Sequence, residues 1–301
     1  PEAATDVFAV KSYTGIGGTR TLDAEFGPVD MAIAVRSEDA TKLYNLLTTR
    51  LTHAELSTNS SAAESSTNFV NLDSNSLVVP GSYYSNASGI PYALWAWKRA
   101  KGFMDVVAYT GSTSNSTVVK HSLGVVPELI ITKRRDGATH WRVWSSYFSS
   151  GGGTGKARLN SDAEWYLGDT SLYSVPTSTE ITQGTENTGN FITYLFASLA
   201  GISKIGSYTG NGSNQTIDCG FSAGARFVLI KRADATGHWY IWDSARGIVA
   251  GNDPRLILNN TTAQVTTDDS VDPHNSGFIV NQVAATNINV SSGTYIFYAI
   301  A

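Results

Sequence analysis

Short apolar runs separated by turn-forming residues dominate the chain. Two of these runs, Leu129–Lys133 and Phe227–Lys231, are rich in β-branched residues. Apolar runs of roughly four to eight residues are typical of buried central strands. The segments that follow, Arg135–Thr139 and Ala233–Gly237, carry Asp and Gly. We therefore expect each run to turn there and return as the second arm of a β-hairpin.

Alternation sorts the two return arms, His140–Trp144 and His238–Trp242, into two faces, because successive side chains of a strand point to opposite sides of the sheet. One face is apolar and is expected to lie in the core: Trp141, Val143, Trp239 and Ile241. The other face is mixed, which suits a surface or a contact between domains: His140, Arg142, Trp144, His238, Tyr240 and Trp242.

Several motifs recur three times in the same order. Tyr-Thr-Gly occurs at 13–15, 109–111 and 208–210, with spacings of 96 and 99 residues. Trp-x-x-Trp occurs at 141/144 and 239/242, and we expect Leu43 and Leu46 to hold these positions in the first copy. A further shared segment opens at Asn59, Asn160 and Asn260. We therefore predict an internal repeat, with domains at 1–103 (a degenerate copy), 104–201 and 202–301.

Each copy consists of short predicted strands between turn signals, which is typical of an antiparallel β-sandwich. One segment is ambiguous. Thr41–Leu51 places its leucines on one helical face, but it aligns with the tryptophan-bearing arm of the other copies, so we favour a strand. The predicted fold is all-β, with three tandem antiparallel β-sandwich repeats of about 100 residues that are jelly-roll-like.

Composition narrows the function classes. Hydrophobic residues make up 42% of the 301 residues and aromatic residues 11%, whereas charged residues make up only 15%. The net charge of −4 and the lack of a clustered basic face argue against a nucleic-acid partner. No apolar run reaches the roughly 18 residues of a membrane span, so no membrane insertion is expected. Cys219 is the single cysteine, which excludes an internal disulfide and a thiolate metal cage.

The third copy carries a resemblance at Tyr208–Ser213, Ile230–Arg232 and Trp239–Arg246. These segments resemble a repeated β-domain of tail-fibre and other virion-surface proteins of tailed bacteriophages, especially marine and cyanobacterial ones. The second copy matches more loosely, with Ser145-Ser146 in place of Asp-Ser. The resemblance implies a structural virion protein, a tail fibre or surface fibre located outside the cell on the tail or capsid surface. It implies host attachment through a cell-surface glycan or receptor, contacts with other virion proteins, and a homo-oligomer, with a trimer as the expected state.

Aromatic and histidine side chains of the mixed face are the candidate ligand-binding residues: Trp144, Trp242, His140, His238 and Tyr240. An exposed tryptophan stacks well on a sugar ring. The alternative for Trp144 and Trp242 is that they fill a second core or a seam between domains. His140 and His238 recur near Asp136 and Asp234, as acid–base pairs do, but their place in a hairpin fits a turn hydrogen bond better.

No recognisable catalytic motif accompanies these residues, so we expect no enzyme, no cofactor and no metal. Asp268, Asp269 and Asp272 offer Ca²⁺ ligands but fit a solvated loop better. The carboxylates of Asp162, Glu164 and Asp169, or of Asp234 and Asp243, keep a polysaccharide depolymerase as the alternative function, and a purely structural component or a non-viral carbohydrate-binding module also remains open. The glycine tract 151–156 is read as a flexible loop. The loops Gly81–Ser88 and Thr177–Asn190 have the composition of adaptable binding loops.

Overall fold

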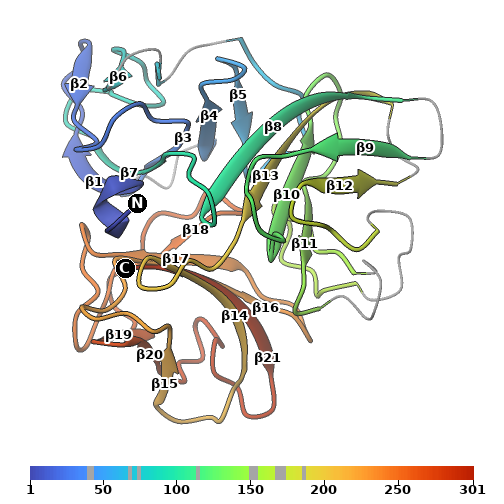
Figure 1. Cartoon of the computed structure of the whole chain (residues 1–301). Coiled ribbons are helices and arrows are strands. Elements are labelled where there is room, and N and C mark those ends of the chain that lie inside the picture. The colour runs from blue at the N-terminus through green and yellow to red at the C-terminus, as the bar shows by residue number, and fades with distance from the viewer. Residues whose placement is uncertain are drawn as a thin grey trace.

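The computed structural model describes residues 1–38, 44–66, 70–72, 76–112, 116–148, 155–166, 174–184 and 188–301. Its strands pair antiparallel and form three large and three small sheets in the described part of the chain. Each large sheet lies beside one small sheet, which gives three β-sandwiches (Figure 1). The predicted all-β, sandwich-type fold is therefore confirmed. The described helical structure is one 3₁₀ turn, η1 (Ala4–Asp6), and no described helix is long and apolar enough to cross a membrane.

Sandwich 1 pairs the large sheet β1-β7-β3-β4-β5 with the small sheet β2-β6: β1 (Phe8–Thr14), β2 (Arg20–Leu22), β3 (Met31–Arg36), β4 (Leu46–Thr49), β5 (Glu55–Ser57), β6 (Leu77–Val79) and β7 (Pro91–Trp97). Sandwich 2 pairs β8-β13-β10-β11 with β9-β12: β8 (Met104–Gly111), β9 (Thr117–Lys120), β10 (Leu129–Arg134), β11 (Arg142–Ser145), β12 (Glu180–Gln183) and β13 (Gly189–Phe196). Sandwich 3 pairs β14-β21-β16-β17-β18 with β15-β20-β19: β14 (Ser203–Thr209), β15 (Gln215–Asp218), β16 (Phe227–Arg232), β17 (Trp239–Asp243), β18 (Leu256–Ile257), β19 (Val271–His274), β20 (Gly277–Val280) and β21 (Thr294–Ile300).

The three large sheets bury both of their faces. Alternate residues of β10 show this: Leu129 and Ile131 belong to a cluster shared by all three sandwiches, whereas Ile130 belongs to the core between β10 and the small sheet of sandwich 2. We call the shared cluster the central core and the other three the outer cores. Burial on both faces explains why these strands read as continuous apolar runs rather than as alternating ones.

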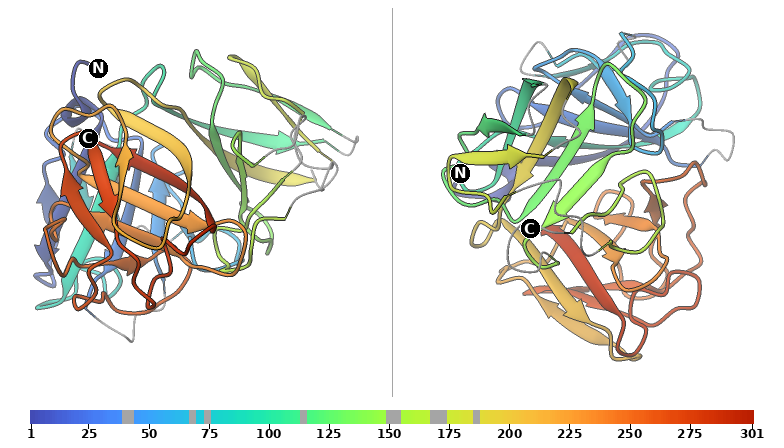
Figure 2. Two further views of the ribbon diagram at one scale, coloured as in Figure 1. Left: turned by 90° about the horizontal axis from the view of Figure 1, so that it is seen from below. Right: turned by 90° about the vertical axis from the view of Figure 1, so that its right-hand side faces the viewer.

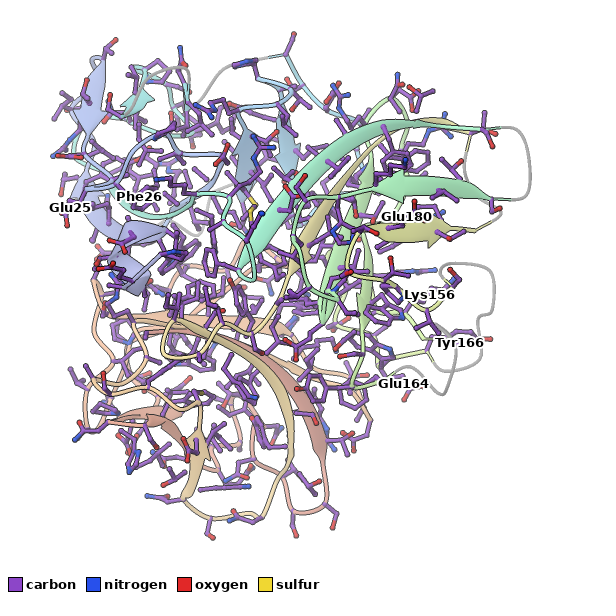
Figure 3. All side chains as sticks on the ribbon, in the orientation of Figure 1. Glu25, Phe26, Lys156, Glu164, Tyr166 and Glu180 are labelled. Atoms are coloured by element: carbon purple, nitrogen blue, oxygen red, sulfur yellow. The ribbon has the colours of Figure 1, made fainter. Side chains whose placement is uncertain are left out.

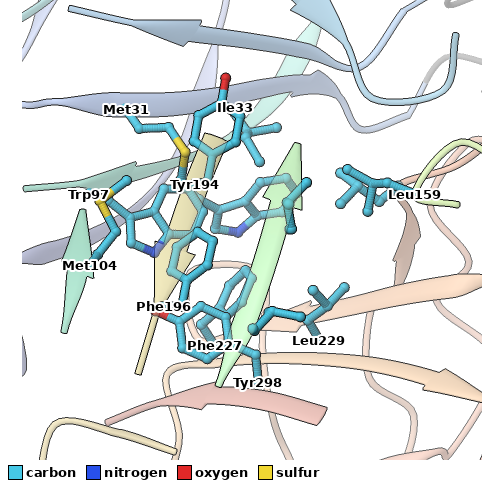
Figure 4. Close-up of a cluster of buried hydrophobic side chains, with 14 of the residues drawn as sticks. Met31, Ile33, Trp97, Met104, Leu159, Tyr194, Phe196, Phe227, Leu229 and Tyr298 are labelled. Carbon is cyan, nitrogen blue, oxygen red and sulfur yellow. The ribbon is translucent and has the colours of Figure 1, made fainter. Parts of the chain in front are cut away.

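Aromatic rings from all three sandwiches meet in the central core (Figure 4). Phe227 of sandwich 3 packs edge-on against Trp97 of sandwich 1, with ring centroids 5.7 Å apart. Phe196 of sandwich 2 lies 5.2 Å from Tyr298 of sandwich 3. The rings leave an apolar cavity of about 40 Å³ between them, which is lined by residues of all three sandwiches. The sandwiches are therefore packed around a common centre, as the views in Figure 2 show, and are not strung out in a line.

Backbone hydrogen bonds close the three sandwiches into a ring. The amide of Glu64 donates to the carbonyl of Arg135 (2.8 Å), that of Trp165 to Ala233 (2.8 Å), and that of Gln264 to Ser37 (2.6 Å). Each bond joins one sandwich to the next, and the third returns from sandwich 3 to sandwich 1. Head-to-tail contacts of this kind close into a ring when their rotation returns to the start.

A second set of side-chain bonds runs around the same ring in the opposite direction. The indole of Trp141 donates to the carbonyl of Ser57, and the indole of Trp239 donates to that of Arg158, both at 2.9 Å. In sandwich 1 the amide nitrogen of Asn45 lies 3.1, 2.9 and 2.9 Å from three carbonyl oxygens of sandwich 3: those of Ile257, Leu258 and Asn260.

Strand register corrects two sequence alignments. Leu47, Val143 and Ile241 occupy corresponding positions, opposite Ile33, Ile131 and Leu229. The positions of the two tryptophans in sandwich 1 are therefore held by Asn45 and Thr48, not by Leu43 and Leu46; Leu43 lies outside the described residues. Likewise Asn259, not Asn260, corresponds to Asn160, because each accepts the amide of the first tryptophan, at 2.9 and 3.1 Å.

The ambiguous segment Thr41–Leu51 contains β4, so the strand is confirmed for Leu46–Thr49, and residues 41–43 lie outside the described residues. The predicted boundaries near 103 and 201 lie between β7 and β8 and between β13 and β14. Whether the three parts are separate domains stays a prediction.

The Tyr-Thr-Gly motif joins the large sheet to the loop that covers it. The hydroxyls of Tyr13 and Tyr208 donate to the carbonyls of Ser85 and Ile288, both at 2.6 Å. A Cβ on Gly15 would collide with the carbonyl of Ala87, and one on Gly210 would collide with that of Val290. Glycine is thus needed where the loop crosses the strand end.

Asn45→Ala is expected to lower the free energy of unfolding by about 2–4 kcal/mol, because it removes the amide that donates to three carbonyls of sandwich 3 and opens a void. The Thr58 hydroxyl still donates to one of these carbonyls, that of Leu258, at 2.8 Å. Chemical denaturation followed by tryptophan fluorescence measures the change. Asn214→Ala, in an exposed loop, is the control and should cost less than about 0.5 kcal/mol. Equal effects of the two substitutions would show that the ring does not depend on Asn45.

Two buried lysines should make stability depend on pH. Burial lowers the pKa of Lys133 and Lys231 to about 8 each, and the Nζ atoms donate to the carbonyls of Arg134 and Arg232, both at 2.7 Å. An unfolded lysine titrates near pH ~10.4, so the unfolded chain holds more protons than the folded chain above about pH 8. The cost of burying the charge is fully present below about pH 8, and it decreases as pH rises from there towards the pKa of the unfolded lysine.

We expect the free energy of unfolding to rise by about 1 kcal/mol per lysine between roughly pH 7.5 and 9. The double variant Lys133→Met/Lys231→Met should lose this rise, since an apolar Val35 holds the corresponding position in sandwich 1. Denaturation curves across this pH range test it, with exposed Lys101→Met as control. Parallel pH profiles of the double variant and the parent chain would contradict the prediction.

Candidate functional site

The tryptophans predicted to form an exposed platform are buried. Trp144 is 3% exposed and Trp242 0%, and each belongs to the outer core of its sandwich. Tyr240 is also buried, and its hydroxyl donates to the carbonyl of Ala285 at 3.3 Å. The small sheets cover this face of β11 and β17, so these three side chains fill a second core and form no exposed surface. The proposed aromatic platform is therefore wrong, and the alternative of a second core is correct.

The two histidines lie at the surface and make the expected hairpin contacts. Nδ1 of His140 lies 3.0 Å from Nδ2 of Asn160, and Nδ1 of His238 lies 3.0 Å from Nδ2 of Asn259. The aspartates bind elsewhere. Asp136 accepts the Arg134 guanidinium at 2.7 Å, and this hydrogen bond holds the pKa of Asp136 below its ordinary value. The histidines and aspartates thus serve two separate turn networks rather than one acid–base pair.

Open pockets lie instead at a corresponding edge of sandwiches 1 and 2. Glu55 bridges Ser65, Lys156 bridges Tyr166, and Arg255 bridges Val265. These bridges mark the same place in the three sandwiches, where the strand next to β4, β11 or β17 meets the returning chain. The sandwiches therefore carry a carboxylate, an ammonium and a guanidinium at one shared position.

In sandwich 1 this place is a pocket of about 240 Å³ lined by tyrosines and a carboxylate. The rings of Tyr44 and Tyr84 lie 5.7 Å apart, and Tyr83 packs edge-on against Tyr84 at 5.3 Å. Tyr44 is 40% and Tyr83 is 51% exposed, whereas Glu55 lines the pocket at only 2% exposure. Exposed tyrosine rings beside a sheltered hydrogen-bond acceptor suit a ligand with both an apolar face and hydroxyl groups.

In sandwich 2 the same place opens into two adjoining pockets of about 470 and 250 Å³. Lys156, Ala157 and Arg158 line both pockets. Glu164 and Tyr166 line the larger pocket, and Figure 3 places Lys156, Glu164 and Tyr166 together at the outer edge of this sandwich. His140 lines the smaller one. His140, a predicted ligand-binding residue, therefore borders an open pocket.

In sandwich 3 an ion pair occupies the corresponding position. The guanidinium of Arg255 lies 2.6 Å from the carboxylate of Asp268 and 5.1 Å from the centroid of the Tyr240 ring. Arg255 is itself buried. The position that borders an open pocket in sandwiches 1 and 2 is therefore filled in sandwich 3 by the Arg255–Asp268 ion pair.

The acidic segment considered for Ca²⁺ is used for internal bonds. Asp269 and Asp272 accept Nδ2 of Asn281 at 2.6 and 3.0 Å, and Asp268 binds Arg255. Burial raises the pKa of the nearby Asp253 to about 7. Within the described ranges, no group of three or more His, Cys, Asp or Glu side chains could hold a metal ion.

The other carboxylates considered for hydrolysis are dispersed. Asp243 is buried and accepts the Trp95 indole at 3.0 Å and the Arg246 guanidinium at 2.6 Å, so it joins sandwiches 1 and 3. Asp234 binds Arg232 at 3.0 Å. Glu164 faces a pocket, and Asp169 lies outside the described residues, as do residues 151–154 of the glycine tract and 185–187 of the Thr177–Asn190 loop.

The sequence reasoning missed Tyr44 and Glu55 as pocket residues and named Tyr84 only through its loop. The loop Gly81–Ser88 has the composition of a binding loop and contains the Tyr83-Tyr84 pair. Tyr44 and Glu55 reach the same pocket from other segments, which no local motif indicates.

Comparison with known proteins identifies the family of the chain. Curated proteins yield no match to the chain. One family model, described as a domain of unknown function (DUF7483), matches residues 3–301. Since the match covers nearly the whole chain, all three sandwiches lie within one family domain, and the chain belongs to the DUF7483 family.

Proposed function

We propose that this chain is a structural protein of a bacteriophage virion, a tail fibre or surface fibre, that attaches to cell-surface carbohydrate through the tyrosine-lined pocket of sandwich 1. The observation that carries the proposal is the convergence of Tyr44, Tyr84 and Glu55 on one open pocket. The phage setting rests on the sequence resemblance, which also implies a trimeric fibre and contacts with other virion proteins.

The chemistry of the pocket suits a sugar. A pyranose ring presents an apolar C–H face to an aromatic ring, and its hydroxyls donate to a carboxylate. The volume of about 240 Å³ is below the roughly 300–1,000 Å³ of pockets for drug-sized ligands, so a single sugar unit at a chain end or branch fits best. Contacts of that size are weak, and a fibre strengthens them by presenting several copies.

A panel of bacterial surface polysaccharides tests the proposal. Tyr84→Ala should weaken binding at least tenfold, because it removes the ring that contacts both Tyr44 and Tyr83. Glu55→Gln tests the acceptor separately. Ile16→Ala, an exposed apolar residue of the same sandwich, is the control and should bind like the parent chain.

Reducing ends are measured in the same wells. Binding without new reducing ends supports attachment, and release of reducing ends would replace the proposal with the depolymerase alternative. Binding that survives Tyr84→Ala, or no binding by the parent chain at high valency, would leave a purely structural virion component.

A further inference from the structure

A pocket of about 380 Å³ lies where sandwich 1 joins sandwich 2, at the connection from β7 to β8 that Figure 1 shows. Two buried carboxylates line it, those of Asp30 and Asp105. Four basic side chains line it as well: Arg50, Lys98, Arg99 and Lys101. Among the described residues, the lining thus carries an excess of two positive charges, although the chain as a whole has a net charge of −4.

Asp30 holds the two arginines in place. Its Oδ1 accepts Nη2 of Arg50 at 3.3 Å and Nε of Arg99 at 3.2 Å, and its Oδ2 accepts the backbone amide of Arg99 at 2.8 Å. The Asp105 carboxylate lies 3.9 Å from the Arg99 guanidinium. A guanidinium has five N–H donors, so each arginine keeps donors that these contacts do not use. Side chains that are already held in position lose less entropy when a ligand binds.

The two lysines are not held in this way. In the part of the chain that the structure describes, neither ammonium group makes a hydrogen bond or an ion pair. The Lys98 charge acts on Asp6 without forming an ion pair, and the Asp6 carboxylate accepts the backbone amides of Glu2 and Ala3 at 2.9 Å. Lys101 is exposed. Both ammonium groups can therefore bind an anion without breaking a hydrogen bond or ion pair of the described structure.

The junction between sandwiches 2 and 3 shows that two sandwiches can be joined without these basic residues. Glu128 takes the place of Asp30 there, and its carboxylate accepts the amide of Ser198 at 2.5 Å, as Asp30 accepts that of Arg99. Strand register and the bridges within the two connections align the junctions residue by residue. The four basic residues then correspond to uncharged ones: Ser146, Ala197, Ser198 and Ala200. The joint therefore requires the carboxylate, whereas the cluster of cations is specific to the first junction.

The excess of two positive charges matches a phosphate group. A phosphate monoester carries a charge of about −1.5 to −2 at pH 7, whereas a carboxylate carries a single negative charge. Guanidinium groups bind phosphate oxygens through two parallel hydrogen bonds, and ammonium groups add compact point charges. The uncharged part of the lining is Pro28, Ala100, Met104 and Ser122, which offers no aromatic ring for a sugar to stack on. The pocket therefore suits the phosphate group itself rather than the molecule that carries it.

We propose that the pocket between sandwiches 1 and 2 binds a dianionic phosphate group, with Arg50 and Arg99 donating to its oxygens and Lys98 and Lys101 balancing its charge. Inorganic phosphate and a phosphorylated sugar both carry this group, and their relative affinities distinguish the two sources. The pocket shares no residue with the tyrosine-lined pocket of sandwich 1, so the inference goes beyond the proposed carbohydrate attachment and does not depend on it.

Isothermal titration calorimetry of the full chain with three probes tests the inference: inorganic phosphate, glucose 1-phosphate and acetate. At least one of the two phosphates should bind about tenfold more tightly than acetate at pH 7.5. Tighter binding of glucose 1-phosphate than of inorganic phosphate identifies a phosphorylated sugar as the source, and the reverse or equal affinity identifies free phosphate. No binding of either phosphate, or acetate binding as tightly as both, would overturn the inference.

The pH dependence of binding tests the charge of the ligand. The second pKa of a phosphate monoester is about 6, so the group loses one negative charge between roughly pH 7.5 and 5.5. The affinity for phosphate should fall over this range at constant ionic strength, whereas acetate keeps its single charge. A phosphate affinity that does not change with pH would show that the pocket does not select a dianion.

The double variant Lys98→Gln/Lys101→Gln should lose about tenfold in affinity for phosphate, because it removes the excess positive charge and leaves the contacts of Asp30 intact. Lys120→Gln/Lys204→Gln removes two cations from other parts of the chain and is the matched control. Equal losses in the two double variants, or an unchanged affinity in the first, would contradict the proposal. Tyr84→Ala should leave the binding of inorganic phosphate unchanged, which separates this pocket from that of sandwich 1.

Discussion

The central core is the constraint on which the rest of the structure depends. Each large sheet packs against apolar residues on both faces. Its outer face packs against a small sheet, and its inner face packs against the other two large sheets. Phe227 of sandwich 3 illustrates the consequence, because its ring contacts Phe8 and Trp97 from two strands of sandwich 1 and Tyr298 from its own sandwich. Removing one sandwich would expose the inner faces of the other two.

Closure of the ring also determines where chemistry is available. Both faces of the large sheets are buried, and the ends next to β4, β11 and β17 supply the carbonyls that accept Asn45, Trp141 and Trp239. The bridges between the strand and the returning chain border the pockets of sandwiches 1 and 2 at this edge. At this edge the ring uses backbone carbonyls as hydrogen-bond acceptors, so the neighbouring side chains can differ between sandwiches and line pockets in sandwiches 1 and 2.

Much of the fold could be predicted from local pattern. The alternation within His140–Trp144 correctly places Trp141 in the core, since a period of two is a property of the strand itself. The same pattern could not reveal that the opposite face is buried too, because the small sheet that covers Trp144 comes from distant β9 and β12. Alignment by residue type also failed in sandwich 1, where Asn45 replaces a tryptophan and keeps its hydrogen-bonding role but not its shape.

The candidate pockets were harder to predict for the same reason. Tyr84 could be found through its loop composition. Glu55 can be recognised as a pocket residue only from the folded structure, in which it lines the same pocket as Tyr44 and Tyr84. Two kinds of corresponding position occur in the three sandwiches: those that close the ring and those that border the pockets. The residues that close the ring repeat in function, whereas the pocket position changes from Glu55 to Lys156 to Arg255. A chain of three joined sandwiches can vary these positions separately, which three identical subunits cannot do, so one molecule can present different contacts on a shared frame.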